Sequence, residues 1–204
     1  FIPDGDGSAR FLFGQPGTQP GAPSFGNAMT VSTLAGAWHL AVCDFLEDGQ
    51  MDVAAVARGQ QSIAILLNNG NRSFQRQFLS GLRSGGHSLA VGDYDGDGHA
   101  DIAAGEGSDA TVFFGKGDGT FPQSISGPLY IPPEPLSAHR FRAADLDGDG
   151  RSELLAIGDG TLAVYLGRSL APGGSFPTVP HLVLSIQRMG RFLEVADANG
   201  DGAL

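Results

Sequence analysis

Residues 89–121 read LAVGDYDGDGHADIAAGEGSDATVFFGKGDGTF. In this stretch a short apolar run leads into an acidic loop, DYDGDGHAD, which begins at Asp93. Two further apolar runs follow with a turn between them, and a glycine-containing turn that ends in Phe121 closes the unit. Each apolar run has about five residues, which is typical of strands and too short for an ordinary helix. The stretch therefore predicts short consecutive strands with an acidic loop between the first two.

The same pattern recurs along the chain. Related acidic loops begin at Asp44, Asp93, Asp145 and Asp197, at spacings of 49, 52 and 52 residues. The apolar runs around the loops are apolar at adjacent as well as alternate positions, so we expect both faces of each small sheet to be buried. Small sheets of this kind must stack against one another. A repeat of about 50 residues then predicts an all-β fold built from the four-stranded antiparallel blades of a β-propeller.

We expect one partial propeller domain over residues 1–204, with units at about 1–37, 38–86, 87–138, 139–190 and 191–204. A two-sheet sandwich would also bury the apolar runs, but it gives no reason for an acidic loop at the same place in every unit. Residues 11–14 align with residues 112–115, which places residues 4–7 in a hairpin turn. Incomplete units at both ends favour a fragment of a longer ring over a four-blade ring that both termini close.

The composition argues against several partners. The chain has 22 acidic residues against 12 Lys and Arg, and Lys116 is the single lysine. Nucleic acid is therefore not an expected partner, because a surface that follows phosphates needs clustered basic side chains. No apolar stretch approaches the roughly 20 residues of a membrane helix, so we expect no membrane insertion. Cys43, the only cysteine, cannot form an intrachain disulfide.

The acidic loops are expected to bind Ca²⁺. Counted from the opening Asp, a full loop has Asp at positions 1, 3 and 5, an acid at position 9, and Gly at positions 4 and 6. Four carboxylates in so short a loop repel one another, and Ca²⁺, which takes about six to eight oxygen ligands, removes that repulsion. The expected ligands of the second loop are Asp93, Asp95, Asp97, Asp101 and the main-chain carbonyl of His99. Those of the third loop are Asp145, Asp147, Asp149, Glu153 and the main-chain carbonyl of Arg151.

The other two loops depart from this pattern. The first loop keeps Asp44, Asp48 and Asp52. It has Leu46 at position 3, so it should bind Ca²⁺ weakly unless Glu47 contributes an oxygen. The last loop offers Asp197, Asn199 and Asp201, and the sequence stops before position 9. An EF-hand is excluded because Ala104 and Ala156 stand where its bidentate Glu is required, and because the flanking segments are strand-like.

Histidines recur at equivalent places before three of the loops. His39, His87 and His139 precede the loop-opening Asp by 5, 6 and 6 residues. We interpret them as a repeated residue at the strand edge, with a ring of imidazoles near the propeller axis that binds a metal or ligand as the alternative. Trp38, the only tryptophan, is expected in the core or at the rim, with stacking on a sugar as its alternative role.

Residues 89–121 and 141–167 resemble FG-GAP/VCBS repeats, which are the blades of integrin-α-type propellers and of many bacterial exported proteins. The resemblance spans essentially the whole chain. It implies a propeller, usually of seven blades, with Ca²⁺ on hairpin loops at one rim, and a secreted or cell-surface location. Leu46 departs from the family pattern, which places Ca²⁺ binding by the first loop in doubt.

The chain has no G-x-S-x-G, H-E-x-x-H, P-loop or C-x-x-C motif, so we expect no catalysis. The expected function is a calcium-binding, non-catalytic propeller that serves outside the cell as a scaffold for adhesion or for binding a protein or glycan ligand. The alternatives are the non-catalytic scaffold of a larger exported enzyme, polysaccharide-degrading or esterase-like, and a carbohydrate-binding propeller.

Overall fold

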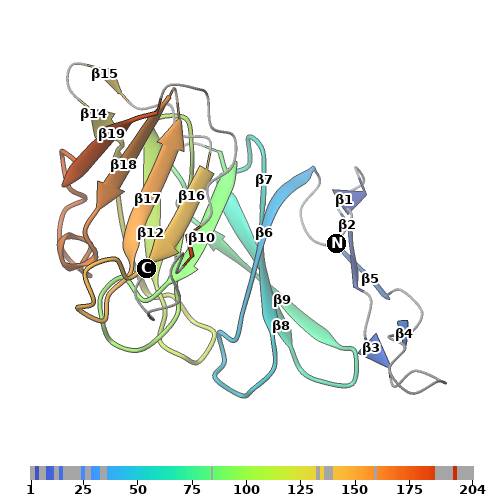
Figure 1. Cartoon of the computed structure of the whole chain (residues 1–204). Helices are drawn as coiled ribbons and strands as arrows, with labels where there is room; N and C mark the ends of the chain where they lie inside the picture. The colour runs from blue at the N-terminus through green and yellow to red at the C-terminus, as the bar shows by residue number, and fades with distance from the viewer. Residues whose placement is uncertain are drawn as a thin grey trace.

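The computed structural model describes residues 3–4, 8–11, 14–15, 24–25, 29–32, 36–83, 85–131, 134–135, 140–158, 160–186 and 195–196. Three four-stranded antiparallel sheets dominate this part of the chain (Figure 1). In each sheet the strands lie side by side in chain order, which is the meander of a propeller blade. The predicted all-β, blade-like architecture is therefore confirmed.

The strand bounds follow the apolar runs of the sequence. The first blade contains β6 (Ala37–Cys43), β7 (Asp52–Ala57), β8 (Ser62–Asn68) and β9 (Phe74–Ser80). The second contains β10 (Ser88–Gly92), β11 (Asp101–Glu106), β12 (Asp109–Phe114) and β13 (Gln123–Pro128). The third contains β16 (Arg140–Ala144), β17 (Glu153–Gly158), β18 (Thr161–Tyr165) and β19 (Leu182–Ser185), with a 3-10 turn, η1 (Gly167–Ser169), after β18. Each of the three acidic loops joins the first strand of its blade to the second, so all three lie at the same end of the blades.

Shorter strands lie outside these blades. β1 (Pro3–Asp4), β2 (Ser8–Phe11) and β5 (Met29–Ser32) form a three-stranded sheet. β3 (Gly14–Gln15) pairs with β4 (Ser24–Phe25), and β14 (Tyr130–Ile131) pairs with β15 (Glu134–Pro135). Asp4 lies opposite Ser8 in the antiparallel β1–β2 pair, which confirms the hairpin expected there. The predicted ligands Asp197, Asn199 and Asp201 and the histidine His139 lie outside the described residues.

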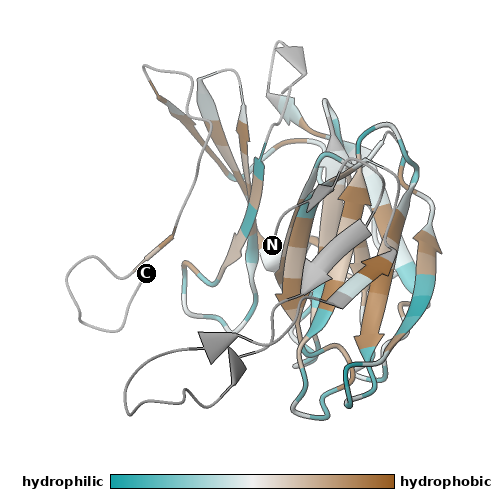
Figure 2. Ribbon diagram, turned by 90° about the vertical axis from the view of Figure 1, so that its right-hand side faces the viewer, coloured by the Kyte–Doolittle hydropathy of each residue, from teal (hydrophilic) through white to brown (hydrophobic). Residues whose placement is uncertain are grey.

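The second blade buries both of its faces, as its sequence predicts. Ile102 and Phe113 pack into an apolar cluster shared with the first blade, which also holds Leu46 and Cys43 at its edge. Phe114, one residue beyond Phe113, packs instead into a cluster shared with the third blade. Neighbouring residues of a strand point to opposite faces, so an uninterrupted apolar run covers both. Figure 2 shows the apolar residues concentrated in the strands and the hydrophilic ones in the loops.

The first strands of the three blades lie next to one another, with β10 packed between β6 and β16. Their approach is close at Gly92, where an added Cβ would lie 2.5 Å from Ser152 Oγ and 2.8 Å from Ala143 Cβ. Only a residue without a side chain fits at that contact. We call β6, β10 and β16 the inner strands.

Candidate metal centre

The second acidic loop is shaped by its first carboxylate. The main-chain N–H groups of Gly96 and Gly98 donate hydrogen bonds to the two oxygens of Asp93, at 2.6 and 2.8 Å. Both glycines have positive φ, 77° and 89°, which glycine adopts without steric cost. The loop therefore wraps tightly around position 1, and the sequence pattern Asp-x-x-Gly-x-Gly is the reason.

Position 9 of the second loop ties the loop to the next hairpin of the blade. Asp101 is fully buried, and its two oxygens accept hydrogen bonds from the N–H groups of Tyr94 and Gly115, both at 2.8 Å. Burial raises the pKa of Asp101 to about 7, the two hydrogen bonds oppose that rise, and the negative charges of Asp95 and Asp93 add to it. A cation beside these three carboxylates would remove the repulsion.

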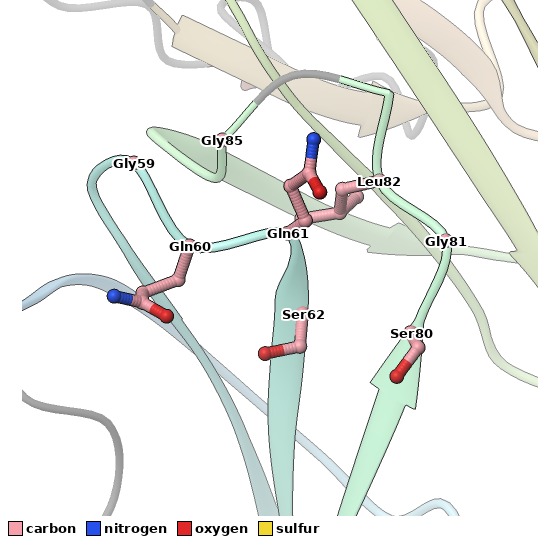
Figure 3. Close-up of a pocket in the computed structure, with 8 residues that line it drawn as sticks. All are labelled: Gly59, Gln60, Gln61, Ser62, Ser80, Gly81, Leu82 and Gly85. Atoms are coloured by element: carbon pink, nitrogen blue, oxygen red, sulfur yellow. The ribbon is translucent and has the colours of Figure 1, made fainter.

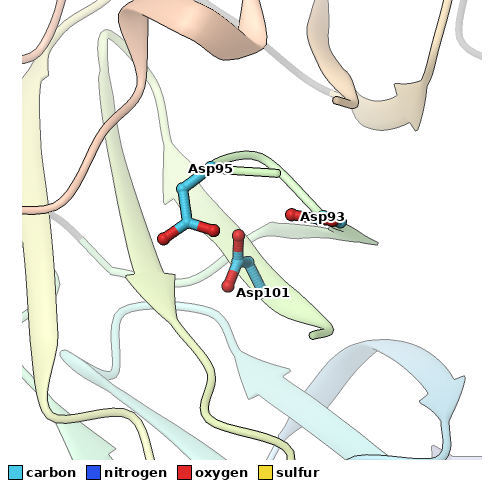
Figure 4. Close-up of side chains that lie close together, drawn as sticks. All are labelled: Asp93, Asp95 and Asp101. Atoms are coloured by element: carbon cyan, nitrogen blue, oxygen red, sulfur yellow. The ribbon is translucent and has the colours of Figure 1, made fainter. Parts of the chain in front are cut away.

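Three carboxylates of the second loop gather around one point. Asp93, Asp95 and Asp101 each offer an oxygen, and these oxygens lie within 4.8 Å of one another. The carboxylates of Asp95 and Asp101 face each other in Figure 4. Ca²⁺ binds oxygens at about 2.3–2.6 Å, so two ligands of one ion lie at most about 5 Å apart. The spacing and the hard, anionic donors therefore fit a divalent cation such as Ca²⁺.

The third loop repeats this arrangement with a glutamate at position 9. Asp145, Asp147 and Glu153 form the second group of acids with oxygens within 4.8 Å of one another. Glu153 is 1% exposed and accepts hydrogen bonds from the N–H groups of Leu146 and Gly167, at 2.6 and 3.4 Å. Two consecutive blades thus present equivalent carboxylate triads.

Position 5 is not part of either triad. One oxygen of Asp97 accepts a hydrogen bond from the N–H of His99, and the other lies 2.9 Å from Nζ of Lys116. Asp149 accepts a hydrogen bond from the N–H of Arg151 at 2.9 Å. The structure brings neither Asp97 nor Asp149 to the triads, and ligation by these side chains and by the carbonyls of His99 and Arg151 stays a prediction.

The first loop keeps the loop shape without a triad. Asp44 accepts hydrogen bonds from the N–H groups of Asp48 and Gly49, at 3.1 and 2.7 Å. Glu47, at position 4, has a φ of 53°, the left-handed conformation that a glycine has in the other loops. Leu46 packs against the cluster between the first two blades, so no oxygen stands at position 3.

The remaining acids of the first loop are also engaged elsewhere. The carboxylate of Asp52 is buried and accepts hydrogen bonds from the N–H groups of Phe45 and Asn68, at 2.8 and 2.7 Å. Glu47 Oε1 lies 2.5 Å from Nδ1 of His99 in the neighbouring loop. Across residues 44–52, all of which are described, no three acids come together as they do in the next two loops.

Main-chain hydrogen bonds join the loops of neighbouring blades. The N–H of Ser152, beside Glu153 in the third loop, donates to the carbonyl oxygen of Asp93 at 2.6 Å. The N–H of Gly119, in the turn between β12 and β13 of the second blade, donates to the carbonyl oxygen of Phe45 in the first loop at 2.9 Å. The rim that carries the acidic loops is therefore continuous across the three blades.

The raised pKa of Asp101 predicts a pH dependence in the absence of Ca²⁺. The native chain holds its proton up to about pH 7, whereas the unfolded chain releases it near pH 4. The free energy of unfolding, measured by urea titration in EDTA, should therefore fall as the pH rises from about 4 to about 7. The Asp101→Asn variant should lack this part of the slope, and saturating Ca²⁺ should abolish it. Equal slopes in the variant and the wild type would contradict the assignment.

The end of the first blade opposite its acidic loop has a polar hollow. A hollow of about 570 Å³ lies between the β7–β8 turn and the end of β9 (Figure 3). Its lining consists of Gly59, Gln60, Gln61, Ser62, Ser80, Gly81, Leu82 and Gly85. Among the described residues that line it there is no carboxylate, the anionic donor from which the two triads are built.

Trp38 and His39 lie next to each other at the start of β6. Trp38 is 51% exposed, so it lies at the surface rather than in the core, and its ring stacks on His87 with the centroids 5.3 Å apart. His39 Nδ1 accepts a hydrogen bond from the N–H of Leu89 in the neighbouring blade at 2.8 Å, and the interpretation of the histidines as repeated strand-edge residues stays a prediction. Within the described residues, no helix is long and apolar enough to cross a membrane.

Sequence reasoning missed the partners that position the acids. Gly115 and Gly167, each 14 residues after the position-9 acid, donate to that acid, and Lys116 and Arg168 follow them as partners of Asp97 and Asp147. In both blades a glycine is followed by a basic residue, as Gly115-Lys116 and Gly167-Arg168. This repeated dipeptide was the signal available in the sequence.

The chain is similar to known proteins in sequence and in structure. The sequence is 32% identical to integrin alpha-PS5 of Drosophila melanogaster over 124 residues. The alignment covers 53% of this chain and 12% of that protein. A solved lectin from Agrocybe aegerita, described as recognising non-reducing terminal N-acetylglucosamine, aligns with a TM-score of 0.49 and 22% identity, over 74% of this chain and 42% of the lectin. The FG-GAP-like repeat matches residues 44–104, 95–156 and 145–204. Three overlapping matches over most of its length show that the chain belongs to the FG-GAP-like repeat family.

Proposed function

We propose that this chain is a calcium-stabilised propeller region that acts outside the cell as a non-catalytic scaffold for adhesion or ligand binding. The observation that carries the calcium part is the pair of equivalent carboxylate triads at the ends of β10 and β16. The integrin relative supports an adhesive role, although the chain spans only about an eighth of that protein's length. The expected ligand is a protein or a glycan, and the expected location is secreted or at the cell surface.

The residues of the second loop would act as follows. Asp93, Asp95 and Asp101 would bind Ca²⁺, which supplies the positive charge that three neighbouring carboxylates require. Asp93 is held by the glycine N–H groups, and Asp101 by Tyr94 and Gly115. The ligands are therefore positioned by the fold before the ion binds. Ion binding then stabilises the native chain by about 2.7 kcal/mol per site when free Ca²⁺ is a hundredfold above Kd.

Calcium removal tests this proposal. EGTA at neutral pH should lower the midpoint of thermal unfolding by about 5–10 °C per occupied site, as measured by circular dichroism. The Asp95→Asn and Asp147→Asn variants each remove one anionic ligand, so each should lose at least about half of the response to EGTA. Asp118→Asn removes the same charge from an exposed turn outside the triads and should respond as the wild type does. Identical melts with and without EGTA would overturn the proposal.

A further inference from the structure

The polar hollow at the end of the first blade is lined by neutral polar side chains whose hydrogen-bonding groups are not used. Gln60 lies in the turn between β7 and β8, Ser62 begins β8, and Ser80 ends β9. No described residue forms a hydrogen bond with the side-chain amide of Gln60 or with the hydroxyl of Ser62 or Ser80. The donors and acceptors of these three side chains are therefore open to a ligand.

These three side chains form one cluster. Ser62 and Ser80 stand directly opposite each other where β8 pairs with β9. Directly opposed residues project from the same face of a sheet, with their Cβ atoms about 4.5–5.5 Å apart. In Figure 3 the side chain of Gln60 extends to the same side as the two serines, whereas that of Gln61 extends to the other. An amide and two hydroxyl groups thus face one space.

Main-chain hydrogen bonds hold the walls of the polar hollow in place. The N–H of Gln60 donates to the carbonyl oxygen of Ala57 at 3.1 Å and closes the turn between β7 and β8. The N–H groups of Gly81 and Gly86 donate to the carbonyl oxygens of Gln61 and Gln60, at 3.3 and 3.0 Å. These bonds tie the segment between β9 and β10 to the same turn. The cluster is therefore positioned before a ligand binds, which reduces the entropy lost on binding.

The polar hollow has room for a small ligand. Its volume of about 570 Å³ falls within the range of roughly 300–1,000 Å³ that small-molecule sites occupy. Two of its lining residues, Gly59 and Gly81, border open space, since a Cβ added to either would meet no atom within 4 Å. The absence of side chains at these two positions keeps that space free.

An exposed aromatic ring lies beside the cluster on the same face of the blade. Phe78 stands opposite Ala64, two residues along both strands from the Ser62–Ser80 pair. Alternation along a strand therefore places its side chain on the face of the two serines, at a distance of about 6.5 Å along β9. Phe78 is 49% exposed, and the guanidinium of Arg76 packs over its ring at 5.2 Å from the centroid.

The chemistry of this surface favours a neutral ligand that is rich in hydroxyl groups. Amide and hydroxyl side chains each offer both donors and acceptors, as the hydroxyl groups of a sugar do. The described lining residues include no acidic or basic side chain, so a charged ligand would lose hydration there without gaining a charged partner. The ring of Phe78 adds an apolar surface, which suits the C–H groups on one face of a sugar ring.

We propose that the polar hollow binds a neutral sugar, with Gln60, Ser62 and Ser80 on its hydroxyl groups and Phe78 against its C–H face. The inference rests on the proposed function, because it names a glycan as the ligand and gives that ligand a place. The hollow lies at the end of the blade away from the acidic loop, so sugar binding uses none of the Ca²⁺ ligands.

Heteronuclear NMR of the whole chain with Ca²⁺ saturating tests the site, because the side-chain amide of Gln60 gives its own signals. At least one of the methyl glycosides of glucose, galactose, mannose and N-acetylglucosamine should shift these signals saturably. The side-chain amide of Gln50, in the first acidic loop, should not respond. No shift with any of the four glycosides, or equal shifts at Gln50, would overturn the inference. Shifts with the peptide probe N-acetylglycine methylamide and with none of the glycosides would overturn the sugar and assign the hollow to a peptide.

Matched variants test the named side chains. Ser62→Ala and Ser80→Ala each remove one hydroxyl, so each should weaken binding of the best glycoside by about two- to tenfold, the value of one hydrogen bond. Phe78→Ala should weaken it as well, and an unchanged affinity would overturn the role of Phe78. Gln75→Ala is the control, because Gln75 stands opposite Leu67 and so lies on the other face of β9. It should bind as the wild type does.

Wild-type affinity in both serine variants would overturn the site. Thermal unfolding of the same variants with and without EGTA keeps this inference separate from the calcium proposal. A serine variant that loses sugar binding should still respond to EGTA as the wild type does. If no glycoside binds and the response to EGTA persists, the sugar site is wrong and the calcium-stabilised scaffold stands.

Discussion

Replacing Asp101 with alanine should lower the free energy of unfolding by about 4 kcal/mol, because two buried N–H groups lose their acceptor at once and each costs about 1–3 kcal/mol. These groups belong to Tyr94, in the loop, and Gly115, after β12. The measurement is urea unfolding in EDTA, so that loss of Ca²⁺ binding does not contribute. The loop and the following hairpin should therefore separate even in the ion-free protein.

Asp97→Ala is the matched control for this prediction. Asp97 belongs to the same acidic loop, but it is exposed, and its side chain pairs with Lys116 at the surface. Exposed ion pairs contribute little to stability, so the variant should lose only a small fraction of what Asp101→Ala loses. If the two variants were equally destabilised in EDTA, the structural role given to position 9 would be wrong.

Gly115→Ala is expected to destabilise the second blade by about 3 kcal/mol or more. An added Cβ would lie 2.2 Å from the main-chain carbonyl oxygen of Ala100, so the backbone of the loop or of the hairpin must move. That movement also breaks the hydrogen bond from Gly115 to Asp101. The change in free energy can be measured by urea unfolding in the presence and absence of Ca²⁺, and Ca²⁺ affinity should fall in parallel.

Gly107→Ala distinguishes steric overlap from backbone conformation. Gly107 has a φ of 65°, and an added Cβ would meet no atom within 4 Å. Its replacement should therefore cost only the roughly 1 kcal/mol of a left-handed alanine. A loss as large as that of Gly115→Ala would show that crowding against Ala100 is not the cause.

Much of the fold could be predicted because the acidic loops give the register of the repeat. The runs before and after Asp93 are apolar at adjacent positions, and the structure buries Phe113 and Phe114 against different blades. Positions 1, 3 and 9 of the second and third loops were likewise identified as acids that share a site, and the structure brings them together. The recurrence of acidic side chains at odd positions was sufficient for this prediction, because the backbone conformation of the loop recurs as well.

The rest depends on contacts between segments that a local pattern does not join. Asp97 is engaged by Lys116, which is 19 residues away on another turn. Leu46 leaves the loop for the core between two blades. The contact between His39 and Ser88 joins residues 49 positions apart, close to one repeat. Residues one period apart on the inner strands are neighbours in space, and the sequence shows this only once the blades are known to stack.

The hydrogen bond from Ser152 to the carbonyl of Asp93 has a consequence for how the rim fills with ions. Asp93 belongs to one triad, and Ser152 precedes Glu153 of the other. A cation that restrains either loop also restrains the main chain of its neighbour, which reduces the entropy that the second cation must remove. The two loops are thus expected to bind Ca²⁺ cooperatively. A Ca²⁺ binding isotherm would then be steeper than that of two independent sites.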